Sequence, residues 1–254
     1  MKFDIQRADF WKRASALLLD IILLATFAVG IAWAMSAILG YDDNFVAIQE
    51  AKEKYCAQYG VDFDNITQEQ LDAMSAEEKQ KYIDADAAYS SDPEVLKATS
   101  LLVSLAPVII SVSLLVSYVC LEVIVPILFK NGVTVGKKVF GLAVIRTNGV
   151  KISGQALFIR SILGKYTMET MVPIFIALMS FLGTLGILGV VLLVLILVLE
   201  IFTVFYTKTR STIHDLISDT VVVDMASQMI FNSEEELIAY KTRIHAEEVA
   251  RSDY

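Results

Sequence analysis

Four acidic residues inside or beside long apolar stretches are the part of this sequence best suited to chemistry. Asp20, Glu122 and Glu200 interrupt apolar stretches, and Asp215 follows the last stretch, next to His214. An ionised side chain at the centre of a membrane helix costs about 2.5–3.5 kcal/mol. Such residues point to function by default, and clustered carboxylates raise one another's pKa, which suits cation binding or proton exchange.

Arg13 allows a second interpretation of these acids. It precedes Asp20 by seven residues, close to two helical turns, so both side chains project from one helix face. In a structural interpretation, Arg13 pairs with Asp20 or Asp215 and fixes helix packing. In a functional interpretation, the three carboxylates of Asp20, Glu122 and Glu200, which lie at similar depth, form a cation or proton site. Both stay open, and the candidate ion- or substrate-binding residues are Arg13, Asp20, Glu122, Glu200 and Asp215.

The composition shows what kind of structure must position these residues. The chain has 254 residues, of which 56% are apolar and 20% are charged, whereas soluble domains average about 45–50% and about 25%. The composition excludes a soluble two-domain enzyme, a disordered chain and a disulfide scaffold. Crossing about 30 Å of hydrocarbon takes about 20 helical residues. We therefore predict four transmembrane helices, at about 14–39, 99–129, 168–182 and 186–206.

Local signals support the limits of these helices. Asp92-Pro93-Glu94 supplies an N-cap, a first-turn proline and a first-turn acid for the second helix. Gly183-Thr184-Leu185-Gly186 is the natural break in the apolar region 171–206, which is too long for one span. The first stretch is not a convincing signal peptide, because it is too long and contains Asp20.

The distribution of charge predicts the orientation. The net charge of −8 is a sum of opposite regions: 40–98 holds fourteen acids against five lysines, whereas 130–165 holds seven basic residues and no acid. The positive-inside rule places 40–98 outside the cell and both 130–165 and the two termini in the cytoplasm. Further basic residues flank the first and last spans, namely Lys2, Arg7, Lys12, Arg13, Lys208 and Arg210.

The outer segment 40–98 is predicted to be helical. Thr67-x-x-Gln70 and Ser75-x-x-Glu78 match the capping-box pattern, in which the first and fourth residues satisfy each other's backbone N–H groups. Such a helical insertion either caps the bundle as a solvated hairpin or offers a docking surface to a partner or a cation.

The inner segment is predicted to contain β-structure. The β-rich stretch 140–147 is followed by Asn148-Gly149 and 150–152, which favours a hairpin. The stretch 154–164 predicts a short interfacial helix. The stretch 219–224 is predicted to add a third strand.

These elements define an all-α membrane protein. We predict a four-helix transmembrane bundle with a small cytoplasmic-face β-hairpin or sheet and a helical extracellular insertion. The predicted divisions are 1–39 (N-terminal segment and first span), 40–98 (acidic insertion), 99–224 (membrane core) and 225–254 (a cytoplasmic tail that forms a capped helix).

Several ordered motifs resemble the RDD family of bacterial membrane proteins, which is named for an Arg and two Asp. The matching stretches are 10–20, 131–142, 149–153 with Arg160, and 214–223. The resemblance implies that Arg13, Asp20 and Asp215 are the signature residues. The sequence departs from the family at Ser218-Asp219, where a small residue and Gly usually precede the Thr, and in its long outer insertion.

The resemblance implies a transport-related role, with monovalent cation/proton antiport suggested for some members. The alternative is a non-transporting scaffold or assembly factor that binds a partner protein, favoured by the acidic insertion and the incomplete charged path across the membrane. The sequence offers no nucleophile–base pair or metal constellation, so we expect no enzyme activity and no cofactor.

The expected partners are the lipid bilayer, monovalent cations or protons, and either a second copy or another membrane protein. The seven basic residues of 130–165 are expected to favour anionic inner-leaflet lipids, at about 1 kcal/mol each. The acidic net charge argues against nucleic acid.

Overall fold

A computed structural model describes residues 5–6, 8–130, 132–207 and 211–252. Lys2, Arg7, Lys208 and Arg210, which contribute to the predicted orientation, and Asn131, which begins one family motif, lie outside the described residues. The chain forms two compact units. Unit 1 comprises the chain through Ala28 together with the chain from Leu114 onward, and unit 2 comprises Val29–Ser113.

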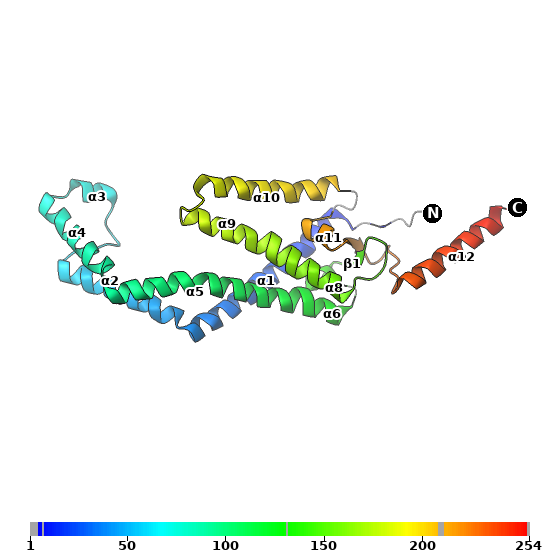
Figure 1. Ribbon diagram of the computed structural model, residues 1–254, viewed down its shortest axis with the longest axis horizontal. Coiled ribbons are helices and arrows are strands. Elements are labelled where there is room, and N and C mark those ends of the chain that lie inside the picture. The colour runs from blue at the N-terminus through cyan, green and yellow to red at the C-terminus, as the bar shows by residue number, and fades with distance from the viewer. Residues whose placement is uncertain (1–4, 7, 131, 208–210, 253–254) are drawn as a thin grey trace. The chain divides into compact units, whose positions relative to one another are not determined.

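Four helices are long and apolar enough to span a membrane, which confirms the predicted class of all-α membrane protein (Figure 1). They run over Phe10–Leu39, Pro93–Phe129, Gly154–Phe181 and Gly186–Tyr206. The first is α1 and the last is α10. The second consists of α5 (Pro93–Tyr118), η1 (Val119–Ile124) and α6 (Val125–Phe129), and the third of α8 (Gly154–Phe158), η2 (Ile159–Met171) and α9 (Val172–Phe181).

The third helix begins earlier than the sequence predicts. The predicted interfacial helix 154–164 is the first part of a continuous helix that ends at Phe181, so the predicted start at 168 is wrong. The prediction stopped at the charged side chains before residue 168, and the structure buries these side chains by pairing them with other elements. The predicted break after this helix is confirmed, with Gly183 in the left-handed region at φ +76°.

The small sheet is paired differently from the predicted hairpin. β1 (Leu142–Arg146) pairs antiparallel with β2 (Thr220–Asp224), so two predicted strands are present but are neighbours of each other. The stretch 150–152 contributes only isolated bridges, one of which joins Lys151 to Ile145. Asn148-Gly149 therefore makes a turn, but β1 obtains its hydrogen-bond partners from the distant strand.

Both faces of this sheet are buried, which explains its almost uniformly apolar sequence. Strand residues alternate between faces. Leu142 and Val144 pack with Ala8 and Ala16 on one side, whereas the residues between them pack in a second cluster with Val133 on the other side. The sheet therefore holds the start of the chain and the first turns of α1 in place.

Asp219 accounts for the departure from the family pattern just before β2. Its backbone is left-handed, with φ +51°, a conformation that favours glycine and that Asp tolerates better than most residues. The hydroxyl of Thr147 donates a hydrogen bond of 2.5 Å to the Asp219 carboxylate. The turn therefore keeps the geometry that a glycine would adopt, and a neighbouring side chain secures it.

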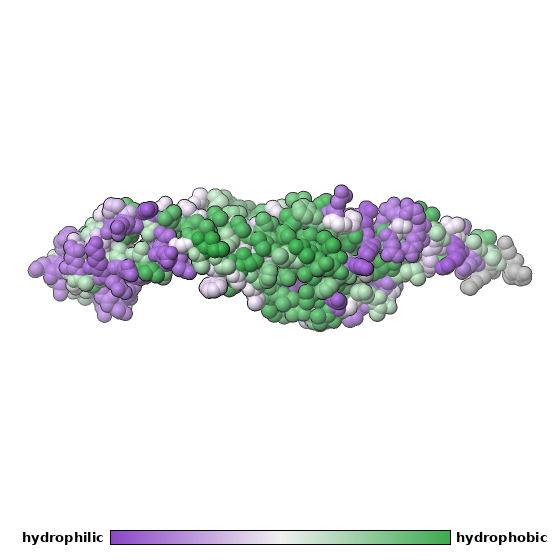
Figure 2. Space-filling model, turned by 90° about the horizontal axis from the view of Figure 1, so that it is seen from below, coloured by the Kyte–Doolittle hydropathy of each residue, from purple (hydrophilic) through white to green (hydrophobic). Residues whose placement is uncertain are grey.

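The membrane-spanning helices present apolar side chains outward. Along α10, Ile187, Val190, Leu197 and Phe205 are all more than half exposed. Figure 2 shows a continuous area of apolar side chains on the visible face. Such an area of exposed apolar surface fits contact with lipid rather than water.

Unit 2 confirms the predicted helical insertion. It contains α2 (Tyr41–Tyr59), α3 (Gln68–Ala73) and α4 (Ala76–Ser90). Both predicted capping boxes form, at the starts of α3 and α4. α2 packs against α4, and the hydroxyl of Tyr55 donates a 2.8 Å hydrogen bond to Asp92, which also caps α5.

Candidate functional site

Asp20 is held by the short helix α7 (Val135–Val139). One carboxylate oxygen accepts a 2.5 Å hydrogen bond from the Thr134 hydroxyl, and the other accepts a 2.7 Å bond from the Gly136 backbone N–H. The Lys137 ammonium lies 3.6 Å from the same carboxylate, and both side chains are only 9% exposed. Two neutral donors and one cation therefore surround the Asp20 carboxylate.

Glu122 is paired with a lysine in the same way. It lies on η1, a π-helical segment of the second span, and its Oε1 is 2.5 Å from the Lys165 ammonium. Both side chains are 8% exposed. The Ser161 hydroxyl donates to the backbone carbonyl of Glu122. These two contacts join the second and third spans.

Asp215 is the most enclosed acid of the site. It lies on α11 (Ile213–Ile217) and accepts hydrogen bonds from Arg160 Nε at 3.0 Å and Nη2 at 2.7 Å. Arg13 lies 3.6 Å from its other oxygen, so the structure selects Asp215 of the two partners predicted for Arg13. Burial alone would raise the pKa of Asp215, but its basic neighbours, Arg160 foremost, together outweigh burial and hold that pKa well below its ordinary value.

His214 connects this pair to Glu169. Its Nδ1 lies 2.7 Å from the Glu169 carboxylate, and its Nε2 lies 3.0 Å from Arg160 Nη2. A guanidinium only donates hydrogen bonds, so Nε2 must accept and Nδ1 must carry the proton. Burial, reinforced by the positive charge of Arg160, lowers the pKa of His214 to about 4, although the carboxylates of Asp215 and Glu169 act in the opposite direction. At neutral pH the ring is therefore a neutral link between Glu169 and Arg160.

Acid is expected to destabilise the protein through His214. Between about pH 6.5 and about pH 4 the unfolded chain binds a proton at this residue and the folded chain does not, so stability is complete above 6.5 and is lost as the pH falls toward 4. His214→Asn should flatten the dependence of the melting temperature on pH in this window. The other histidine, His245, is exposed on α12 (Glu234–Ser252), so a slope that survives His214→Asn but disappears in His245→Asn would contradict the assignment.

These contacts form one charge network that is balanced at neutral pH. Lys137 connects its parts, because Lys165, Glu122, Arg160 and Asp20 all act on it electrostatically. Burial, reinforced by the positive charge of Lys165, lowers the pKa of Lys137 to about 8. With neutral His214, four acids face four bases: Asp20, Glu122, Glu169 and Asp215 against Arg13, Lys137, Arg160 and Lys165.

Three network residues lie on η2 and were missed as site residues by the sequence analysis. In a π-helix the hydrogen bonds run from i to i+5, so residues five apart lie one above the other. Arg160 and Lys165 therefore share a face, and Glu169 follows one turn later. In an α-helix, positions five apart diverge, so the two bases were interpreted as surface charge. The five-residue spacing of charges in one apolar helix was the available signal.

The predicted cluster of three carboxylates does not assemble. Asp20 and Glu122 each have their own lysine, and in the described part of the chain no three His, Cys, Asp or Glu residues are grouped to hold a metal ion. Glu200 on α10 is half-buried and takes part in no ion pair among the described residues. The helix α10 itself contains no lysine or arginine that could pair with Glu200.

The basic residues of 130–165 are also divided by burial. Lys137, Arg160 and Lys165 are buried in the network, at 8%, 1% and 6% exposure, so they are not available to lipid headgroups at the surface. Arg146 pairs with Glu234 on α12. The predicted attraction to anionic lipids therefore applies only to those of the seven basic residues that are exposed, and not to Lys137, Arg160 and Lys165.

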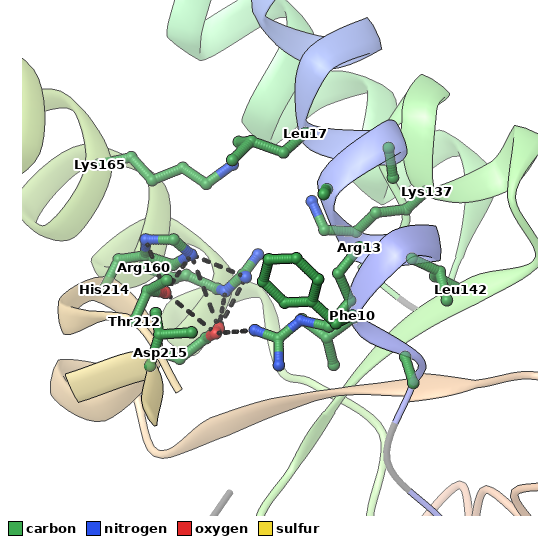
Figure 3. Close-up of a pocket in the computed structure, with 15 residues that line it drawn as sticks. Phe10, Arg13, Leu17, Lys137, Leu142, Arg160, Lys165, Thr212, His214 and Asp215 are labelled. Carbon is green, nitrogen blue, oxygen red and sulfur yellow. Dashed lines mark hydrogen bonds and ion pairs between the residues drawn. The ribbon is translucent and has the colours of Figure 1, made fainter. Parts of the chain in front are cut away.

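A cavity of about 240 Å³ in unit 1 adjoins the network (Figure 3). Arg13, Lys137, Arg160, Lys165, His214 and Asp215 contribute to its polar wall. Figure 3 shows the guanidinium of Arg160 between Asp215 and the ring of Phe10, with its marked contacts directed to Asp215 and His214. The cavity therefore exposes the cationic side of the network.

Together, the four apolar helices and the buried network define a multi-pass membrane protein with a polar site in its core. The family model of the RDD family matches residues 7–219, which is most of the chain, so the protein belongs to the RDD family. No curated protein and no solved structure matches the chain. The three signature residues lie in the network, Arg13 with Asp215 and Asp20 with Lys137.

Proposed function

We propose that this RDD-family protein is a transporter that exchanges a monovalent cation for a proton through the charge network of unit 1. One observation carries the proposal: Asp20 and Glu122, both within membrane-spanning helices, have buried lysine ammonium groups as counter-ions. Buried charges are costly unless they are paired, and inside membranes they mark ion and proton pathways.

The geometry supports exchange by competition. A monovalent cation that approaches Asp20 would take the position of the Lys137 ammonium, which lies 3.6 Å from the carboxylate. The two positive charges are mutually exclusive there, since one carboxylate compensates one charge. The hydrogen bonds from Thr134 and Gly136 keep the Asp20 carboxylate oriented in either case. Loss of the lysine charge as a proton would leave the network neutral with the cation bound.

We further propose that the protein lies in the bacterial cell membrane with both termini in the cytoplasm. The excess of basic residues in 130–165 over 40–98 supports this orientation. Asp20 follows the start of α1 by ten residues, so in this orientation the network lies toward the cytoplasmic side.

Asp20→Asn is expected to abolish exchange, because the amide keeps the shape of the side chain but removes the charge for which a cation and Lys137 compete. Proteoliposomes with an internal pH dye, given an inward Na⁺ or K⁺ gradient, should show proton efflux with the unmodified protein and only background with the variant. The matched control is Asp224→Asn, which removes an acid paired with Lys12 at the edge of the sheet and should leave exchange unchanged. Undiminished flux in a monodisperse Asp20→Asn protein would overturn the site.

A second candidate is a scaffold or assembly factor. It is favoured by unit 2, whose helix α4 begins with its own capping box. The helices α2 and α4 carry exposed acids such as Asp43, Glu53, Glu77 and Asp84. If the unmodified protein shows no flux under gradients of either cation, this second function is preferred.

A further inference from the structure

The cavity beside the charge network is lined by side chains of two chemical kinds. The larger apolar ones include Phe10, Leu17, Leu142 and Val204. Four of the described lining residues are cationic, and Asp215 is the single acid among them. Asp215 is already engaged by Arg160 and Arg13. The described lining therefore combines an excess of positive charge with apolar side chains (Figure 3).

Arg160 supplies the second observation that points to a ligand. Its side chain is 1% exposed, and its Nε and Nη2 both bond to Asp215. Its Nη1 is buried, and no hydrogen-bond acceptor is within reach of it among the described residues. Leaving a buried charged donor without an acceptor is costly, so such a group usually has a partner.

We propose that this cavity binds the anionic headgroup of a phospholipid, with the phosphate against the cationic lining residues and the first carbons against the apolar ones. A phosphate presents the acceptor oxygens that the Arg160 Nη1 lacks, and guanidinium and ammonium groups are its usual partners. Such a site differs from the attraction of exposed basic residues to a membrane surface, because its basic residues Lys137, Arg160 and Lys165 are buried and line a cavity.

The size and position of the cavity fit this ligand. A buried apolar cavity of about 150 Å³ holds a benzene ring, and the cavity here is about 240 Å³, which suits a phosphate and a few carbons but not a whole lipid. Phe10 and Leu17 line it and are also exposed on α1, at 43% and 51%. Acyl chains can therefore continue from the cavity along the lipid-facing side of α1.

The inference does not depend on the proposed cation exchange, because it rests on the cationic wall and not on the pairing of Asp20. Native mass spectrometry of the full-length protein tests it with three probes added separately: phosphatidylglycerol, phosphatidylcholine and inorganic phosphate. We expect one phosphatidylglycerol per chain to survive release from detergent, and neither of the other two probes. The mass of the adduct separates an intact lipid from a free anion.

Two variants assign the adduct to the cavity. Val204→Phe fills part of the cavity without removing a charge, and Arg13→Gln removes one positive charge from its lining. Each variant should reduce the phosphatidylglycerol adduct at least several-fold. Val198→Phe is the matched control, because Val198 is an exposed valine on the same helix outside the cavity, and it should retain the adduct. Equal retention of phosphatidylcholine, binding of inorganic phosphate alone, or an undiminished adduct in Val204→Phe would each overturn the proposal.

Discussion

Replacing Arg160 with methionine is expected to destabilise the protein by about 3–5 kcal/mol, the usual effect of removing one partner of a buried ion pair. The change removes the two hydrogen bonds that reach Asp215 at 2.7 and 3.0 Å. It also removes the donor at His214 Nε2. The Thr212 and Thr220 hydroxyls still reach Asp215, but they carry no charge. The measurement is the melting temperature of the full-length protein in detergent.

Two further variants separate the unpaired charge from the lost packing. Arg13→Met should cost less, because Arg13 lies 3.6 Å from Asp215 and is 16% exposed, whereas Arg160 is 1% exposed. The double variant Arg160→Met with Asp215→Leu should be more stable than Arg160→Met alone, since it removes the acid that the single change leaves without its main partner. If the double variant were less stable by the sum of both single effects, the two side chains would not be coupled and the network would be misassigned.

The sequence was informative about elements whose signals are local. The N-cap of Asp92, the two capping boxes and the break at Gly183 each depend on residues within one turn, and the structure has all of them. The pairing of β1 with β2 joins segments more than seventy residues apart. Asn148-Gly149 favours a local partner for β1, and only the packing of the whole unit selects the distant one.

The same difference between local signals and long-range contacts applies to the residues of the site. The acids could be found because each is an isolated charge in an apolar stretch. Their partners could not, because Lys137, Arg160 and Lys165 occupy a segment whose charge already had an explanation in the orientation of the chain. The π-helical segment η2, which places Arg160 and Lys165 on one face, packs against the second span and α11. A prediction based on α-helical periodicity therefore places Arg160 and Lys165 at the surface, where they are not found.

Gly136→Ala is expected to separate α7 from α1 and to disable the site. A Cβ atom at this position would lie 2.2 Å from the backbone oxygen of Ala16 and 2.8 Å from an Asp20 carboxylate oxygen. A backbone atom cannot rotate away, so the helices must move apart. Overpacking usually costs about 1–3 kcal/mol, occasionally more. The movement would also lengthen the 2.7 Å hydrogen bond from the Gly136 N–H to Asp20.

The variant should therefore lower both the melting temperature and any exchange that depends on Asp20. Gly154→Ala is the matched control: this glycine has no atom within 4 Å of the added Cβ and no left-handed backbone, so its melting temperature should be unchanged or slightly higher. A Gly136→Ala protein as stable as Gly154→Ala would show that α7 does not lie against α1. Asp20 would then lack its two hydrogen-bond donors, and its pairing with Lys137 could not serve exchange.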